Sequence, residues 1–204
     1  MSILLYALVD APDAPDWIQQ QVYQLLADDS VTVVAKKENW TKNYAYFEEP
    51  HVIKNGQTYN SAFNKAVELD QQSLQWVQEH IGPVIRDIRA VKTGSEDAPH
   101  KGPHTDISRD YTIIYLMEHG GQDHITCFFR EKGHPDIVRP RGYFLKDYDQ
   151  TEMLCGRPLP MNAWCLINSS VLHSVNNVAQ GRISIHLSLD HVENLRLKDR
   201  LYIE

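Results

Sequence analysis

The segment at residues 182–189, RISIHLSL, places the strongest constraint on the fold, because apolar and polar side chains alternate along it without a break. The apolar set is Ile183, Ile185, Leu187 and Leu189, and the polar set is Arg182, Ser184, His186 and Ser188. Successive side chains of a strand point to opposite faces, so the segment is predicted to be a strand with one apolar and one polar face. The polar face either lines a wet interior or meets solvent, and periodicity alone does not decide between the two.

Other short segments rich in β-forming residues follow Pro83, and turn residues such as Gly120-Gly121 and Gly133 separate them. The predicted strands lie at residues 84–93, 110–118, 124–131, 142–148, 161–167, 171–178 and 182–190. Many short strands at this spacing are typical of a β-sandwich or a β-barrel.

The first third of the chain mixes both kinds of element. Strands are predicted at residues 3–9 and 31–35, and helices at residues 14–29 and 61–80. Trp17, Val22, Leu25 and Leu26 share one face of the first helix, while Ser61 is the expected N-cap of the second and Gly82-Pro83 its end. Amphipathic helices of this kind cover one face of a sheet. The predicted fold class is therefore α+β, mainly β, with N-terminal helices packed on one sheet.

The composition narrows the class of protein. With 204 residues, 42% of them hydrophobic, the chain is expected to form a single domain, residues 1–204, with a helix-containing portion at 1–83 and a β-rich core at 84–190. A net charge of -7 lacks the basic footprint of a nucleic-acid-binding protein, so no nucleic-acid partner is expected. Cys127, Cys155 and Cys165 are widely spaced and suggest neither a disulfide framework nor a zinc ribbon, which favours a reducing, cytoplasmic setting. Neither a signal peptide nor an apolar run long enough to span a membrane is recognised.

A possible metal site begins with the pair His104 and Asp106, which are two residues apart. In an extended backbone both side chains point to the same side, so an imidazole and a carboxylate converge. His173, in a later β-rich segment, can complete a facial set of two histidines and one carboxylate, the arrangement associated with non-haem Fe(II) oxygenases. The pair alone is a weak signal, because His104 taken by itself is better interpreted as a loop histidine, and His124 is the strongest competing ligand.

Arg182 and Ser184 follow His173 on the polar face of the last predicted strand. A guanidinium binds a carboxylate through two parallel hydrogen bonds, and a neighbouring hydroxyl can add a third. An arginine buried beside a metal needs an acidic ligand, although an exposed arginine after the turn at Gly181 is the simpler interpretation of Arg182 alone.

Taken in order, the His-x-Asp pair, the distant His173 and Arg182-x-Ser184 resemble the pattern of the 2-oxoglutarate/Fe(II)-dependent dioxygenase superfamily over residues 84–190. The resemblance implies a double-stranded β-helix (jelly-roll) core. It also implies iron ligation by His104, Asp106 and His173, and a grip on the distal carboxylate of 2-oxoglutarate by Arg182 with help from Ser184.

The segment 109–121, RDYTIIYLMEHGG, is similar to the strand that follows the His-x-Asp pair in prolyl-hydroxylase-like members. This likeness makes Tyr115 the first candidate, and Tyr111 the second, for a phenol that hydrogen-bonds the co-substrate, with two core aromatic residues as the alternative.

The function implied by the resemblance is hydroxylation of an unactivated C–H bond with release of succinate and CO2, using Fe(II) as cofactor and 2-oxoglutarate as co-substrate. Two alternatives stay open: a cupin-type metal enzyme that does not use 2-oxoglutarate, and a non-catalytic metal-binding jelly-roll module. Arg182-x-Ser184 argues against the first and the complete triad against the second. The expected substrate is a small molecule, an amino acid or a peptide; the sequence names neither the substrate nor the oligomeric state, and no membrane partner is expected.

Overall fold

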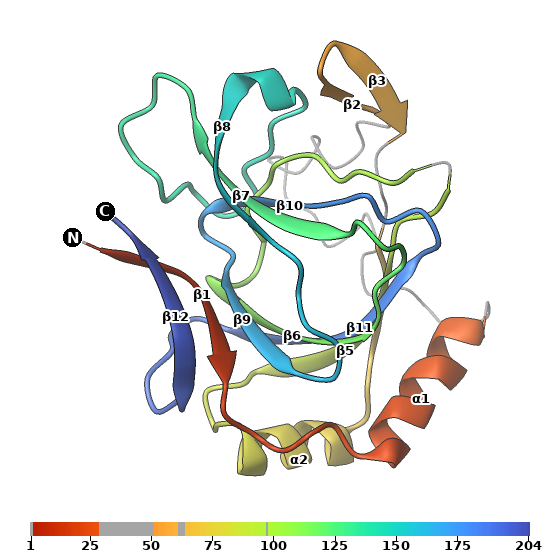
Figure 1. The fold of residues 1–204 in the computed structure, drawn as a ribbon. Helices are drawn as coiled ribbons and strands as arrows, with labels where there is room; N and C mark the ends of the chain where they lie inside the picture. The colour runs from red at the N-terminus through yellow and green to blue at the C-terminus, as the bar shows by residue number, and fades with distance from the viewer. Residues whose placement is uncertain (1, 29–50, 61–63, 97) are drawn as a thin grey trace.

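Two antiparallel β-sheets face each other in the computed structural model, and two helices cover the outer face of the larger sheet (Figure 1). The structure describes residues 2–28, 51–60, 64–96 and 98–204. The larger sheet has the order β12 (Leu197–Ile203), β1 (Ile3–Val9), β9 (Trp164–Asn168), β6 (Tyr111–Glu118), β11 (Arg182–Leu189), β5 (Asp87–Thr93) and β4 (Asn64–Glu68). The smaller sheet has the order β10 (Leu172–Asn176), β7 (Ile125–Glu131) and β8 (Thr151–Arg157). The pairing is antiparallel within both sheets, and the architecture is a jelly-roll, as predicted.

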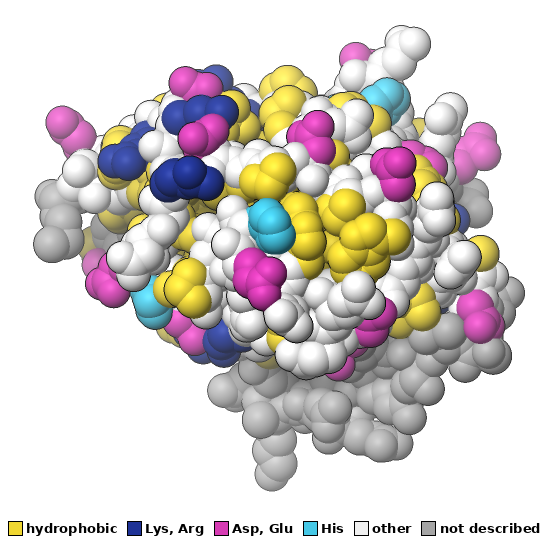
Figure 2. Space-filling model, turned by 90° about the horizontal axis from the view of Figure 1, so that it is seen from below, with side chains coloured by type: hydrophobic (Ala, Val, Ile, Leu, Met, Phe, Trp, Pro, Cys, Tyr) yellow, Lys and Arg dark blue, Asp and Glu magenta, His cyan; other side chains and the backbone are white. Residues whose placement is uncertain are grey.

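The helices α1 (Asp16–Ala27) and α2 (Gln71–His80) pack on the larger sheet through one face each. In α1, Ile18, Val22 and Leu26 are buried at a spacing of four residues, which places them on one side of the helix. Trp17, predicted to lie on the same face, is 38% exposed, because the buried stripe is centred one residue later. Seen from the side of α2, acidic side chains are scattered among hydrophobic and neutral ones (Figure 2).

Three apolar clusters hold these layers together. The largest lies between the larger sheet and the helices and takes in Ile185, Leu187 and Leu189 of β11, so the apolar face of this strand packs on the helices as its alternation predicted. A second cluster, around Phe128 and Ile167, lies between the two sheets. The third covers the outer face of the smaller sheet beneath the hairpin of β2 (His51–Lys54) and β3 (Gln57–Asn60).

The predicted helix at 61–80 is wrong over residues 64–70, and its predicted N-cap, Ser61, lies outside the described residues. Residues 64–68 form β4, which pairs with β5, and α2 begins only at Gln71. The Asp70 side chain caps this helix by accepting a hydrogen bond of 2.8 Å from the amide of Ser73. The helical spacing of apolar residues continues on both sides of Asp70, but residues 64–68 pair with β5 and form a strand instead.

The other differences concern short strands. Residues 142–148 do not form the predicted strand; they run into the short 3-10 helix η3 (Tyr148–Gln150), and β8 follows where a connection was expected. The β2–β3 hairpin, which turns at Asn55-Gly56, and β12 were not predicted. The predicted strand at 31–35 lies outside the described residues. Within the described part of the chain, no helix is long and apolar enough to cross a membrane.

Candidate metal and co-substrate site

The three side chains proposed as metal ligands meet in the structure. Nε2 of His104 and Nε2 of His173 each lie 3.8 Å from Oδ1 of Asp106, and one ligand atom from each residue falls within 4.8 Å of the others. The backbone fixes the two histidines against each other, because the amide of each donates to the carbonyl of the other at 3.0 and 2.9 Å. The amide of Asp106 donates to the carbonyl of Ser169 at 3.0 Å, which ties the third ligand to the turn before β10.

Hydrogen bonds on the far side of each imidazole set its orientation. Nδ1 of His104 lies 2.9 Å from the carbonyl of Gly102, and Nδ1 of His173 lies 3.0 Å from the carbonyl of Val171. A carbonyl only accepts hydrogen bonds, so Nδ1 carries the proton in both rings and Nε2 presents its lone pair toward Asp106. This is the arrangement in which histidines bind metals.

Asp106 is held by two neighbours that the sequence did not single out as site residues. Nε of Arg109 donates to Oδ2 of Asp106 at 2.6 Å, and the hydroxyl of Thr112 donates to the same oxygen at 2.8 Å. Arg109 is itself fixed by a bond of 2.8 Å from Nη1 to the hydroxyl of Ser188 on β11. Oδ2 is therefore occupied, and Oδ1 is the oxygen that faces the histidines.

The charges of the triad suit a divalent cation. Burial lowers the pKa of His104 well below its usual value, and the nearby Lys101 and His173 lower it further. Burial also lowers the pKa of His173, with Asp106 opposing the shift. Burial alone would raise the pKa of Asp106, but Arg109 and the two histidines bring it well below the usual range. At neutral pH the set is two neutral imidazoles and one carboxylate, which suits Fe(II).

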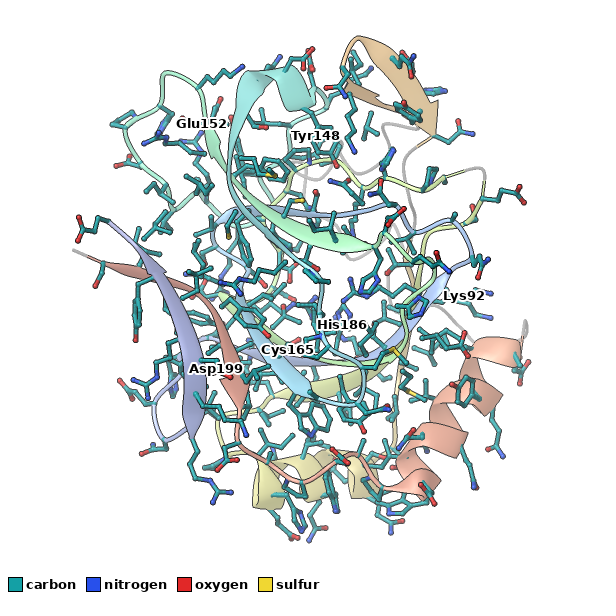
Figure 3. All side chains as sticks on the ribbon, in the orientation of Figure 1. Lys92, Tyr148, Glu152, Cys165, His186 and Asp199 are labelled. Atoms are coloured by element: carbon teal, nitrogen blue, oxygen red, sulfur yellow. The ribbon has the colours of Figure 1, made fainter. Side chains whose placement is uncertain are left out.

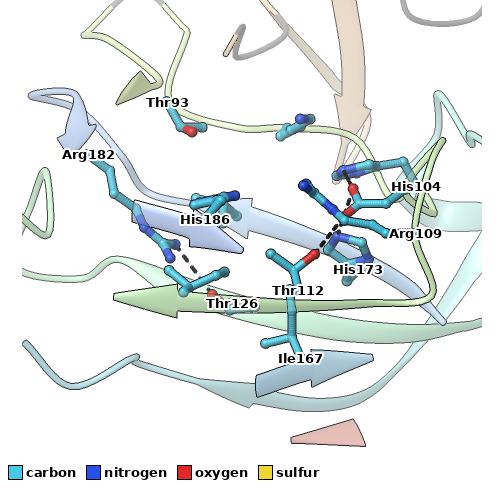
Figure 4. A pocket seen from close by; sticks show the side chains of 13 residues that line it. Thr93, His104, Arg109, Thr112, Thr126, Ile167, His173, Arg182 and His186 are labelled. Atoms are coloured by element: carbon cyan, nitrogen blue, oxygen red, sulfur yellow. Dashed lines mark hydrogen bonds and ion pairs between the residues drawn. The ribbon is translucent and has the colours of Figure 1, made fainter. Parts of the chain in front are cut away.

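The triad lines a cavity between the sheets. Arg182, the first residue of β11, lines the same cavity away from the triad (Figure 4). The cavity is partly open to solvent and has a volume of about 40 Å³, room for a few water molecules. Arg182 is 1% exposed and is the most deeply buried charge in its lining. Larger ligands therefore require the partly exposed side chains at the mouth, such as Lys101 and His186, to move.

Arg182 has hydrogen-bonding capacity that the protein does not use. Among the described residues, Nε and Nη2 have no hydrogen-bond partner, and Nη1 lies 3.5 Å from the hydroxyl of Thr126. Burial lowers the pKa of Arg182 to about 10, so the side chain is still a cation at neutral pH. A buried cation without a counter-charge is costly, which makes this guanidinium a built-in site for an anion.

The polar face of β11 points inward, which decides between the two options left open by its alternation. His186 lies between the two sheets (Figure 3) and lines the cavity between Arg182 and the triad (Figure 4). Ser184, expected to assist Arg182, is fully buried on the same face, and its hydroxyl lies 3.0 Å from Nε2 of His186. Ser184 is therefore in contact with a residue that lines the cavity, but does not line it itself.

The two tyrosines are not brought to the cavity. Tyr115 packs against Trp164 in the cluster beneath the helices, and Tyr111 packs against the same cluster. The alternate residues of β6, Thr112 and Ile114, face the cavity instead. The two tyrosines therefore lie on the face of β6 opposite to the expected one. Because β6 is buried on both faces, its sequence does not show which face turns toward the cavity.

Comparisons with known proteins support the fold. No protein-family model and no curated protein sequence matches the chain. Among solved structures, the non-heme alpha-ketoglutarate-dependent epimerase SnoN from nogalamycin biosynthesis superposes with a TM-score of 0.51 at 11% identity, covering 91% of this chain and 78% of that one. An oxidoreductase of the 2OG-Fe(II) oxygenase family from Burkholderia pseudomallei gives a TM-score of 0.39 at 10% identity, covering 69% of this chain and 70% of that one. The coconut allergen cocosin gives 0.34 at 9% identity, covering 68% and 27%. The chain therefore shares its fold with a non-haem, α-ketoglutarate-dependent enzyme.

Proposed function

We propose that this chain is an Fe(II)- and 2-oxoglutarate-dependent oxygenase, which hydroxylates a C–H bond of a small molecule, an amino acid or a peptide and releases succinate and CO2. The observation that carries the proposal is the presence, in one cavity, of a complete two-histidine, one-carboxylate set and a buried arginine with unused donors. The fold shared with an α-ketoglutarate-dependent epimerase supports the same assignment.

Each of these residues has a part in binding. His104, Asp106 and His173 would hold iron through Nε2, Oδ1 and Nε2, while Arg109 and Thr112 keep Oδ2 of the carboxylate turned away. Arg182 would bind the distal carboxylate of 2-oxoglutarate with its unused Nε and Nη2 donors. Iron(II) with 2-oxoglutarate supplies the O2-dependent oxidation, and the protein orients the reactants and shields them from water.

Burial of Arg182 is also the feature that separates this proposal from its alternatives. A metal enzyme without 2-oxoglutarate has no need for a buried guanidinium that no carboxylate of the described residues pairs with. A non-catalytic module has no need for it either, since removal of the charge would relieve a cost to folding.

The test uses anaerobic protein with Fe(II) and 2-oxoglutarate. The expected result is a weak metal-to-ligand charge-transfer band in the visible region and slow succinate formation when O2 is admitted. Arg182→Met is expected to weaken 2-oxoglutarate binding by roughly 100-fold, the loss of a charge-assisted bidentate contact, and to leave iron binding nearly unchanged. His104→Ala is expected to abolish iron binding.

Arg130→Met is the matched control, because Arg130 is a partly exposed arginine of β7 that pairs with Glu152 outside the cavity. Iron binding without any 2-oxoglutarate response would favour the two alternatives, a cupin-type metal enzyme or a non-catalytic metal-binding module. Absence of iron binding would contradict the metal site itself. Product mass separates hydroxylation from epimerisation, the reaction named for SnoN, since hydroxylation adds one oxygen atom and epimerisation adds none.

A further inference from the structure

The cavity lining carries more positive charge than the proposed function requires. It contains three cationic side chains, Lys101, Arg109 and Arg182, and one carboxylate, Asp106. His104, His173 and His186 do not add to the count, because burial lowers the pKa of each. A divalent metal and a dicarboxylate co-substrate bring charges that cancel each other, so the loaded site keeps a net positive charge in a protein whose overall charge is -7.

Two of the three cations already have a partner or an assigned ligand. Arg109 is bound to Asp106 and Ser188, and Arg182, which is 1% exposed, is proposed to bind the distal carboxylate of the co-substrate. Lys101 is left. Among the described residues, its ammonium group makes no hydrogen bond and no ion pair.

The position of Lys101 is fixed by its backbone. Its amide donates to the carbonyl of Val175 at 3.0 Å, and its carbonyl accepts from the hydroxyl of Tyr148. Val175 follows His173 on the same face of β10 and also lines the cavity, so Lys101 lies on the histidine side of the site. The side chain is partly exposed, unlike Arg182 and Thr126, which places Lys101 nearer the mouth.

Within the described part of the chain, no carboxylate forms an ion pair with the Lys101 ammonium group, although Asp106 lies close enough to act on it. Burial lowers the pKa of Lys101 to about 8, and the nearby Asp106 carboxylate offsets this shift only in part. Asp106 is the acidic residue of the cavity, and its carboxylate is already bonded to Arg109 and Thr112 on one oxygen and turned to the histidines with the other. An ammonium group without a partner at the mouth of a reaction site is suited to binding an anion that enters from solvent.

We propose that the substrate carries an oxyanion group, a carboxylate or a phosphate, and that Lys101 binds it at the mouth of the cavity. This inference rests on the proposed function, because it assigns the co-substrate to Arg182 and the substrate to Lys101. Lys101 would hold the anionic end of the substrate and leave the remainder of the molecule to extend toward the triad.

The experiment detects anion binding and needs no knowledge of the substrate. Protein loaded with redox-inert Zn(II) and saturated with 2-oxoglutarate is titrated with acetate, inorganic phosphate and neutral acetamide, and binding is followed by NMR of the Val175 amide and the lysine ε-carbons. Saturable shifts with acetate or phosphate but not with acetamide are expected, and Lys101→Met is expected to weaken this binding at least tenfold. The anion that binds more tightly identifies the source of the oxyanion.

Lys92→Met serves as the control, because Lys92 is exposed at the periphery of the molecule (Figure 3) and should bind acetate as the unmodified protein does. Absence of saturable anion binding, or binding that Lys101→Met leaves unchanged, would overturn the inference. If the initial loading shows no binding of 2-oxoglutarate, the proposed function fails by itself. The anion titration is then made on Arg182→Met protein, where it still tests Lys101 alone.

Discussion

At the scale of single residues, function and stability pull in opposite directions at Arg182. The side chain is a cation buried inside the jelly-roll, and its pKa of about 10 means that it carries this charge, and the associated cost, at every pH below that value. Replacement of a buried charge by an apolar side chain of similar volume is often stabilising.

Arg182→Met is therefore expected to raise the free energy of unfolding of the ligand-free protein by about 1–3 kcal/mol at pH 7. Urea denaturation of the metal-free and co-substrate-free proteins measures the difference. Addition of Fe(II) and 2-oxoglutarate should reverse the order, since the arginine protein then gains binding energy that the variant lacks. A ligand-free Arg182→Met protein less stable than its parent would show that Arg182 is satisfied within the fold.

The residues of the site differ in how far the sequence reveals them. His104, Asp106, His173 and Arg182 could be predicted because their types and order follow a known pattern. Arg109 stands three residues after Asp106, and that spacing was the one available signal for its ion pair. The place of Lys101 in the cavity could not be predicted, because it depends on irregular backbone that is hydrogen-bonded to Val175 and not on the alternation of a strand.

At the scale of elements, β11 explains why Arg182 points where it does. The strand pairs with β5 on one side and β6 on the other, so its alternation is fixed and its polar face turns into the cavity. Its start is set by the turn after β6: a Cβ added to Gly120 would lie 2.7 Å from the amide nitrogen of Arg182 and 2.9 Å from the carbonyl carbon of Gly181. Gly120 also has a φ of +71°, which side-chain-bearing residues rarely adopt.

Gly120→Ala is accordingly expected to destabilise the protein and to displace the start of β11. Gly133→Ala is the matched control, because Gly133 has a similar φ of +77° but nothing within 4 Å of an added Cβ. Both variants incur the backbone strain of roughly 1 kcal/mol, and Gly120→Ala should lose about 1–3 kcal/mol more from the steric contact. Only Gly120→Ala should weaken 2-oxoglutarate binding. Equal effects of the two variants on stability and binding would refute the steric argument.

The same scale shows where prediction from the sequence ends. The amphipathic β11 could be assigned to its faces, whereas β6 is buried on both sides and its tyrosines were turned the wrong way. The helical spacing that included 64–68 gave no sign of the pairing of β4 with β5, which joins residues more than twenty positions apart. Local patterns define an element's two faces but not its partner.

At the scale of the whole molecule, the jelly-roll is closed by contacts that no local pattern reveals. β1 pairs with β12, with Leu4 opposite Tyr202, so the two ends of the described chain lie side by side at one edge of the larger sheet (Figure 1). The three apolar clusters pack between layers, on both sides of the sheets, and none depends on the triad side chains. The frame is thus expected to form before any metal binds.

Metal removal should consequently lower the melting temperature without unfolding the protein. A metal at 100 times its dissociation constant stabilises by about 2.7 kcal/mol, which corresponds to roughly 5–11 °C for a domain of this size. Anaerobic protein with Fe(II) is compared with protein treated with a chelator, by circular dichroism during heating. The chelated protein should keep its full β-sheet signal at 25 °C, and His104→Ala should show no shift with metal. Loss of the β-sheet signal on chelation would mean instead that the triad is part of the folding core, as in small domains built around a structural metal.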